Sequence, residues 1–307
     1  MKWGRRSTGG KNRHYLVFGG GLVGAAIDEA IARGGHWQAT AMRWDWTDAD
    51  QRRAQLAALP GLMGESARID IIWAAGVSGF SSTDADMATE TGHVAEVAAL
   101  ARTLSDQCPI VAFHLFSSIG GLFEGQSWIG AESQPRALRP YGRGKLEQEA
   151  MVLDLAPGIV PRIYRPSSVY GFTPNGRRGL FAAIIASTLT NRPAVIFGSP
   201  HTLRDYVFAQ DIGDFLAGTL ARPLTGETVM LLASGKPTSL SEAIATIEAQ
   251  IGRRYYGRFD KAPHNALDMT VRMTALPPGL RRTPLRLGIN LVHQSMLRSL
   301  ISEAHAP

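Results

Sequence analysis

A GxGxxG pattern at 19–24 stands between a short apolar run and a helical pattern. The run HYLVF at 14–18 predicts a buried strand, and AAIDEAIARGG beyond the glycines predicts a helix that ends on glycine. In this setting the glycines allow a tight turn, the approach of a pyrophosphate and close helix packing, while the helix start offers free N–H groups. The pattern also arises by chance, but its context favours a dinucleotide site. That site would comprise Gly19, Gly21, Leu22, Val23 and Gly24.

Apolar runs alternate with helical patterns over roughly the first half of the chain. Expected strands lie at 14–18, 38–42, 69–76, 109–118 and 160–168, with helices between them. This alternation predicts an α/β fold with a doubly wound, parallel, Rossmann-type sheet. We expect a flexible tail at 1–13, an NAD(P)-binding domain at 14–165 to which 196–222 returns, and a smaller substrate-binding domain at 166–195 and 223–307.

Composition narrows the class of protein further. The 307 residues are 45% apolar and 19% charged, which is ordinary for a globular chain. No run approaches the length of a membrane span, no secretory signal is visible, and the single cysteine fits a reducing cytoplasm. The net charge of +6 comes from scattered basic residues without a nucleic-acid motif, and no metal-ligand spacing occurs. We therefore expect no membrane, nucleic-acid or metal partner.

Tyr141 and Lys145 form a YxxxK pattern at the start of an expected helix. Residues four apart share a helix face, so the lysine charge would stabilise the tyrosine phenolate and create a proton donor and acceptor. Ser117 and Ser118 end the preceding strand, and strand carboxyl ends share one crevice in a parallel sheet. The two serines could equally be plain strand-end hydroxyls; the pattern downstream favours catalysis.

The second expected strand ends without an acid at its tip. Dinucleotide folds that use NAD commonly place an acid there for the adenosine ribose, whereas an arginine can accept the 2′-phosphate of NADP. Arg43 therefore favours NADP(H) over NAD, although Asp45 or Asp48 could still serve NAD or the adenine and Arg43 could be a solvated residue.

Several segments together resemble the extended short-chain dehydrogenase/reductase family, the NAD-dependent epimerase/dehydratase group. The resemblance covers about 14–290 and rests on VFGGGLVG, IIWAAG, FSSIGGLF, PYGRGK, RPSSVYG, IFG and RDYVFAQDI. It implies a nucleotide-sugar substrate and a homodimer. It also implies roles for single residues: Tyr141 as acid/base, Lys145 on the nicotinamide ribose, Ser118 rather than Ser117 at the reacting oxygen, Arg204 on the substrate diphosphate, and Ala74, Ala75, Gly76, Pro166 and Ser168 beside the cofactor.

The chain departs from the family pattern at identifiable positions. Phe18 stands where the first glycine of TGxxGxxG is usual, and Glu90 stands where asparagine is common. Ile119 and Gly120 occupy the place of an acidic pair found in the dehydratases, which disfavours dehydration. We therefore expect an NAD(P)-dependent epimerase or reductase of a nucleotide-activated sugar. The alternatives are a carbonyl reductase for another substrate and a non-catalytic dinucleotide sensor.

Overall fold

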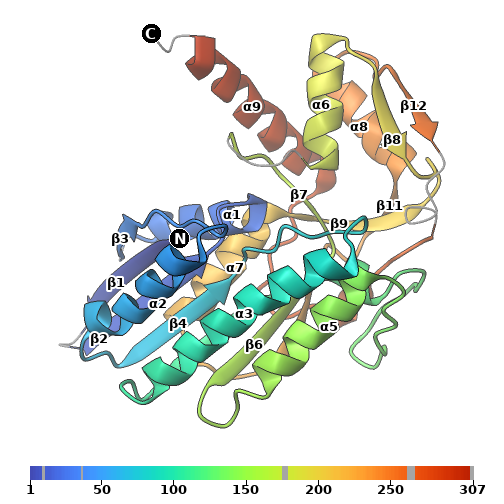
Figure 1. The fold of residues 1–307 in the computed structure, drawn as a ribbon. Helices are drawn as coiled ribbons and strands as arrows, with labels where there is room; N and C mark the ends of the chain where they lie inside the picture. The colour runs from blue at the N-terminus through green and yellow to red at the C-terminus, as the bar shows by residue number, and fades with distance from the viewer. Residues whose placement is uncertain (9–10, 36, 175–178, 261–266, 305–307) are drawn as a thin grey trace.

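A seven-stranded sheet runs through the larger of two lobes (Figure 1). The computed structural model describes residues 1–8, 11–35, 37–174, 179–260 and 267–304. The order of strands across the sheet is β10-β6-β5-β4-β2-β1-β3, and β2, β4, β5, β6 and β10 run parallel. The strands are β1 (Lys2–Thr8), β2 (Lys11–Phe18), β3 (Gln38–Ala41), β4 (Arg68–Trp73), β5 (Val111–Phe116), β6 (Val160–Pro166) and β10 (Val229–Leu232). The expected Rossmann-like α/β fold is confirmed.

Helices cover both faces of this sheet because its buried strands carry apolar side chains on both sides. On β4, Ile71 packs into the core beneath α2, α3 and α5, while its neighbour Ile72 packs into the core beneath α1 and α7. Successive strand residues point to opposite faces, so one apolar run serves two cores. The helices are α1 (Leu22–Arg33), α2 (Ala49–Met63), α3 (Asp84–Ser105), α4 (Ile119–Leu122), α5 (Pro140–Leu153) and α7 (Ala209–Ala221).

The prediction of a flexible tail at 1–13 is wrong for residues 2–8 and 11–13, which lie in strands; residues 9–10 are outside the described part of the chain. Residues Lys2–Thr8 form β1, which lies antiparallel between β2 and β3 and satisfies backbone groups of both. Gly4 lets this strand lie against the Tyr15 ring, since a Cβ there would stand 2.1 Å from the ring. Lys2 Nζ forms an ion pair with Asp28 of α1 at 3.0 Å. Backbone pairing and these contacts order a segment whose composition is polar.

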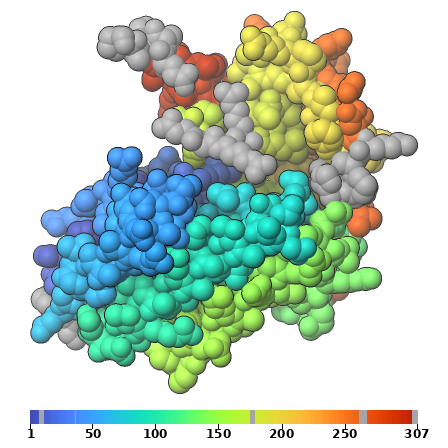
Figure 2. Space-filling model, in the orientation of Figure 1, coloured from blue at the N-terminus to red at the C-terminus, as the bar shows by residue number. Residues whose placement is uncertain are grey.

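The smaller lobe lies over the carboxyl ends of the parallel strands, because β6 passes through Ser167 directly into β7 (Figure 1). Its core joins three helices and two small sheets. In Figure 2 this lobe rises in yellow and orange above the larger lobe, and Figure 1 shows that the C-terminal end of the red α9 extends away from the other helices of the lobe. Its elements are β7 (Ser168–Tyr170), α6 (Leu180–Thr190), β8 (Ala194–Phe197), β9 (Leu203–Phe208), β11 (Pro237–Ser239), α8 (Leu240–Ile251), β12 (Gly257–Asp260), the 3-10 turn η2 (Met273–Ala275) and α9 (Leu285–Ala304).

Two segments depart from the expected domain boundaries. β10 is an edge strand of the central sheet, although the expected boundary assigned everything after 222 to the smaller domain. β8 pairs with β12 and β9 pairs with β7 and β11, and both contribute to the core of the smaller lobe, so the return to the larger lobe begins with α7. Among the described residues, no helix is both long and apolar enough to cross a membrane.

Two glycines of α7 provide a matched test of the packing of α1 on α7. A Cβ at Gly213 would lie 2.2 Å from the Ala26 carbonyl oxygen, whereas a Cβ at Gly218 would meet nothing within 4 Å. We expect Gly213→Ala to lower the free energy of unfolding by about 1 to 3 kcal/mol through overpacking. Gly218→Ala should raise it by up to about 1 kcal/mol through helix propensity. Urea denaturation of both variants measures the contrast, and equal effects would contradict this packing.

Candidate functional site

The glycine turn brings three backbone segments into contact. Gly19 has a φ of +120°, and a Cβ there would lie 2.3 Å from the Ala74 carbonyl oxygen at the end of β4. A Cβ at Gly24 would lie 2.2 Å from the Gly19 carbonyl oxygen, so only glycine lets α1 begin this close to β2. By contrast, the space above Gly20 and Gly21 is open, with no atom within 4 Å of either ideal Cβ.

The start of α1 suits an anion. Gly21 is the N-cap, no side chain caps the helix, and the first turn carries no acidic residue. The first backbone N–H groups, among them those of Leu22 and Val23, therefore keep donor capacity beside the open face of the turn. A side-chain-free cradle and uncapped N–H groups are what a pyrophosphate requires, so these residues fit a dinucleotide.

A cavity of about 430 Å³ contains four of the predicted site residues, Ser118, Tyr141, Ser168 and Arg204. Tyr141 stands in the first turn of α5, directly after Pro140. Its ring lies against α4, since a Cβ at Gly121 would be 2.9 Å from the ring. A Cβ at Gly142 would be 2.0 Å from the Gly121 carbonyl oxygen, so two glycines allow α4 and α5 to meet.

The two neighbouring serines have different surroundings. Ser118 is the N-cap of α4, and its Oγ accepts a hydrogen bond from the Gly121 N–H at 3.1 Å. It lines the same cavity as Tyr141. Ser117 is buried, and its Oγ has no hydrogen-bond partner among the described residues. Ser118 is therefore the hydroxyl that faces the space in which Tyr141 could act.

Lys145 lies beneath Tyr141 in a buried polar cluster. Its Nζ is 5.8 Å from the centroid of the Tyr141 ring and donates to Glu90 Oε1 at 2.8 Å and Gln148 Oε1 at 3.0 Å. Burial alone would raise the pKa of Glu90. The Lys145 charge and hydrogen bonds from Lys145, Ser78 and Gln148 outweigh burial and lower the pKa of Glu90 to about 2.

Arg204 reaches the cavity from β9 and is 9% exposed. Its Nη1 donates to the Leu267 carbonyl oxygen, while its buried Nη2 has no partner among the described residues. Burial lowers the pKa of the Arg204 guanidinium. Asp205 is engaged elsewhere, because it accepts hydrogen bonds from Ser234 N at 2.6 Å and Ser234 Oγ at 2.9 Å. Arg204 thus presents an unused donor that an anionic ligand could satisfy.

A second cavity, of about 400 Å³, lies beyond the carboxyl end of β4. Ala75 and Glu90 line it together with Trp46, Trp73 and His93. The ring centroids of Trp46 and His93 are 4.9 Å apart and the ring planes are tilted by 39°, so one wall of the cavity is aromatic. Lys145 and Glu90 therefore lie between this aromatic cavity and the one that contains Tyr141.

Of the remaining predicted cofactor residues, Gly76 and Pro166 lie near the site, whereas Asp45 and Arg43 lie in the segment after β3. Gly76 lies against the Glu90 and Lys145 side chains, and Pro166 is buried at the end of β6. Asp45 accepts from the backbone N and Oγ1 of Thr47 at 2.8 and 2.6 Å, so its carboxylate caps a local turn. Arg43 is exposed after β3, which β1 separates from β2.

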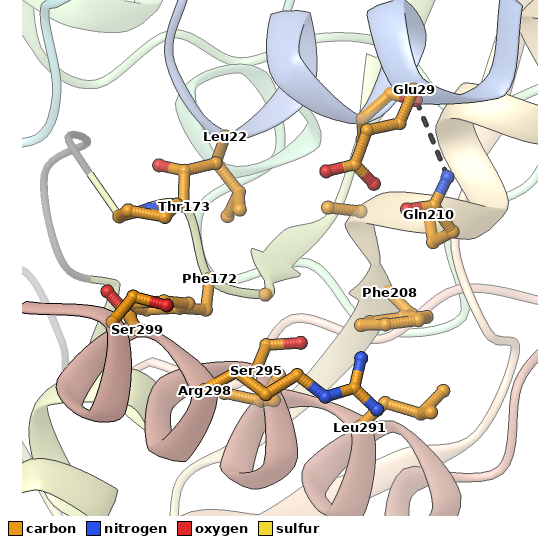
Figure 3. A pocket seen from close by; sticks show the side chains of 16 residues that line it. Leu22, Glu29, Phe172, Thr173, Phe208, Gln210, Leu291, Ser295, Arg298 and Ser299 are labelled. Atoms are coloured by element: carbon orange, nitrogen blue, oxygen red, sulfur yellow. Dashed lines mark hydrogen bonds between the residues drawn. The ribbon is translucent and has the colours of Figure 1, made fainter. Parts of the chain in front are cut away.

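A third cavity, of about 580 Å³, lies between α1, α7 and α9 (Figure 3). Of the predicted site residues, it includes Leu22. Figure 3 shows Phe208, Leu291 and Arg298 on one side and Glu29 facing Gln210, whose amide nitrogen donates to Glu29 Oε2 at 3.0 Å. Tyr141, Lys145 and Arg204 do not line this cavity, and Tyr141 and Arg204 line the cavity of about 430 Å³ instead.

Comparison with known proteins identifies the family. The profile of the NAD dependent epimerase/dehydratase family matches residues 15–232, so the chain belongs to this family. A provisionally named UDP-glucose 4-epimerase of Methanocaldococcus jannaschii is 30% identical over 154 residues, 48% of this chain and 50% of the relative. The match thus spans about half the length of that curated relative.

Solved structures with low sequence identity share the fold. MoeE5 in complex with UDP-glucuronic acid and NAD has a TM-score of 0.76 at 19% identity, covering 93% of this chain and 99% of MoeE5. The UDP-glucose 4-epimerase of Thermus thermophilus, solved with NAD, has a TM-score of 0.74 at 17% identity, covering 91% and 97%. TunA, an NAD-dependent NDP-hexosamine 5,6-dehydratase, has a TM-score of 0.72 at 16% identity, covering 93% and 98%.

Sequence reasoning missed the residues that support the site. Gly121 and Gly142 bring α4 and α5 together, and Gln148 completes the hydrogen bonding of Lys145. The paired glycines in SSIGGLF were a visible signal of close approach, whereas the contact of Glu90 with Lys145, 55 residues away, had no local signal.

The Glu90 carboxylate should make the stability of the protein sensitive to acid. Because folding lowers the pKa of Glu90 from 4.5 to about 2, its contribution is complete above the unfolded value and is lost as pH falls from 4.5 towards 2. The size of this contribution is on the order of 3 kcal/mol. We expect the stability difference between wild type and Glu90→Gln to shrink over this interval. Urea titrations at stepped pH measure it; a constant difference would contradict the ion pair.

Proposed function

We propose that the protein is an NAD(P)-dependent epimerase or reductase of a nucleotide-activated sugar. The observation that carries this proposal is the shared cavity of Ser118, Tyr141 and Arg204, with Lys145 beneath the tyrosine. A proton relay and an anion-binding donor in one space suit a substrate with a reacting hydroxyl and a diphosphate. A bound nicotinamide supplies acceptance and return of a hydride at the sugar carbon.

Each side chain then has a distinct task. Tyr141 takes the proton from the sugar hydroxyl and returns it, while the Lys145 charge stabilises its phenolate form. Ser118 donates to the reacting oxygen, and this requires its Oγ to keep a free proton while accepting from Gly121 N–H. Lys145 also holds the nicotinamide ribose, and Ser168 and Pro166 border the nicotinamide end.

The glycine turn would hold the pyrophosphate, and the aromatic cavity at Trp46 and His93 suits the adenine. Arg43 is the residue that favours NADP(H). Against it, β1 is inserted between β2 and β3, which places the end of β3 roughly 5 Å further from β2 than in a sheet where the two strands are neighbours. We therefore propose a tightly held NAD and an epimerase, with an NADPH-consuming reductase as the second candidate.

Two further features belong to this proposal. Ile119 and Gly120 are buried in α4 and bring no acid or base beside Ser118, which supports epimerisation over dehydration. The outer faces of α3 and α5 border a groove of about 550 Å³. We propose that the enzyme acts in the cytoplasm and dimerises through this face of α5. Sedimentation of the purified protein tests the dimer.

Arg204 is the group we propose for the substrate diphosphate. We expect Arg204→Gln to raise the KM for a UDP-sugar by roughly 10- to 100-fold, because one charge-assisted contact is lost. The matched control is Arg258→Gln, an exposed arginine of β12 that lies outside the cavity. Steady-state kinetics measure both, and an unchanged KM for the UDP-sugar in Arg204→Gln would contradict the assignment of Arg204 to the diphosphate.

Tyr141 tests the chemistry directly. We expect Tyr141→Phe to lower kcat by about 100- to 10,000-fold with dinucleotide binding retained, because only the transferable proton is removed. The readout is conversion of UDP-glucose followed by NMR. Tyr256→Phe, at an exposed tyrosine outside the cavity, is the control and should keep full activity. Full activity in Tyr141→Phe would overturn the proposed mechanism and revive the dinucleotide sensor.

A further inference from the structure

Glu90 closes a hydrogen-bonded network around the Lys145 ammonium. Both side chains are nearly inaccessible, at 4% and 3% of their surface. Gln148 bridges them, since it accepts from Lys145 Nζ at 3.0 Å and donates to Glu90 Oε1 at 3.2 Å. The second oxygen of Glu90 accepts from the backbone N–H groups of Val77 and Ser78, each at 3.1 Å. The carboxylate is therefore fixed from two sides.

The backbone leaves this network little room to move. A Cβ at Gly76 would lie 3.1 Å from Glu90 Oε1 and 3.2 Å from Lys145 Nζ. The loop after β4 therefore encloses the ion pair, and glycine at this position lets the pair form. Tyr141 lies on the other side of Lys145, 5.8 Å from Nζ to the ring centroid.

Other charged groups from the elements around Tyr141 and Lys145 have partners of their own or lie across a cavity. The ion pairs are Arg143 with Asp84 at 2.8 Å, Arg139 with Glu124 at 2.8 Å and Arg165 with Glu149 at 2.6 Å. The other charged or titratable groups are Asp86, which accepts from the N-cap Thr83 in the capping box of α3, His93, which packs on Trp46, and Arg204 on β9. The charge that directly opposes Lys145 is that of Glu90.

We propose that Glu90 is a positioning residue that holds Lys145 under Tyr141 and offsets part of its charge, so that the ion pair sets the pH at which Tyr141 exchanges its proton. Two opposite charges 2.8 Å apart in a buried site act on a nearby phenol as a dipole, and the field is weaker than that of the ammonium alone. This inference rests on the proposed role of Tyr141. Glu90 touches neither substrate nor the reacting atoms and acts through Lys145.

The test is Glu90→Gln, which keeps an acceptor for Lys145 and removes the charge. We expect the acid limb of kcat/KM to move to lower pH by about one unit, because the uncompensated ammonium stabilises the Tyr141 phenolate more strongly. Ultraviolet difference titration of the protein without substrate, with Tyr141→Phe as the blank, should show the same shift. This second readout does not depend on turnover.

Two further variants complete the experiment. Glu149→Gln removes an equal charge from the other buried ion pair on α5, with Arg165, and should leave the limb in place. Glu90→Asp keeps the charge but withdraws it from Lys145, so it should give a smaller shift in the same direction and serves if Glu90→Gln does not fold.

A limb that stays in place or moves to higher pH in the Glu90 variants overturns the inference. Failure of the proposed function can be distinguished from failure of this inference, because Tyr141→Phe would then remain active. An inactive Tyr141→Phe together with an unshifted tyrosine titration in Glu90→Gln would reject the role of Glu90 alone.

Discussion

The site depends on the close approach of backbone segments at the carboxyl ends of the parallel strands. Gly19 touches the end of β4, Gly24 touches Gly19, and Gly142 touches Gly121. A side chain at any of these positions would push apart the elements that carry the site. The contacts of Gly19 and Gly24 hold the uncapped N-terminus of α1 beside the open glycine turn. The contact of Gly142 with Gly121 places the Tyr141 ring beside α4, the helix capped by Ser118.

Two cationic side chains, Arg204 and Lys145, lie near these backbone contacts and differ in their partners. Arg204 lines the cavity of Tyr141, and its buried Nη2 has no hydrogen-bond partner among the described residues. A hydrogen bond from this group to an anionic ligand would be stronger than the same bond in water, because the local dielectric constant is lower. Lys145 instead has its charge paired by Glu90 before any ligand arrives. Arg204 thus has a donor available for a ligand, whereas Lys145 is held in a hydrogen-bonded network between the two cavities.

Local patterns predicted much of this arrangement. Apolar runs alternating with helices predicted the Rossmann-like sheet, and the glycine spacing predicted the turn between β2 and α1. The polar segment at the N-terminus gave no strand signal, because β1 is ordered by pairing with β2 and β3 and by contact of Gly4 with Tyr15. The glutamate at position 90 was visible as a departure from the family pattern, but its partner was not. Both misses depend on which segments pair and pack together, and the periodicity of one segment does not encode its partner.

The most direct test of the account is to denature the purified protein and identify any released dinucleotide by mass spectrometry, with NADH and NADPH titrations of the native protein alongside. The account predicts NAD released in a near-stoichiometric amount, held by the turn at Gly19–Gly24 and by Lys145. Release of no dinucleotide, combined with no binding of NADH or NADPH, would contradict it.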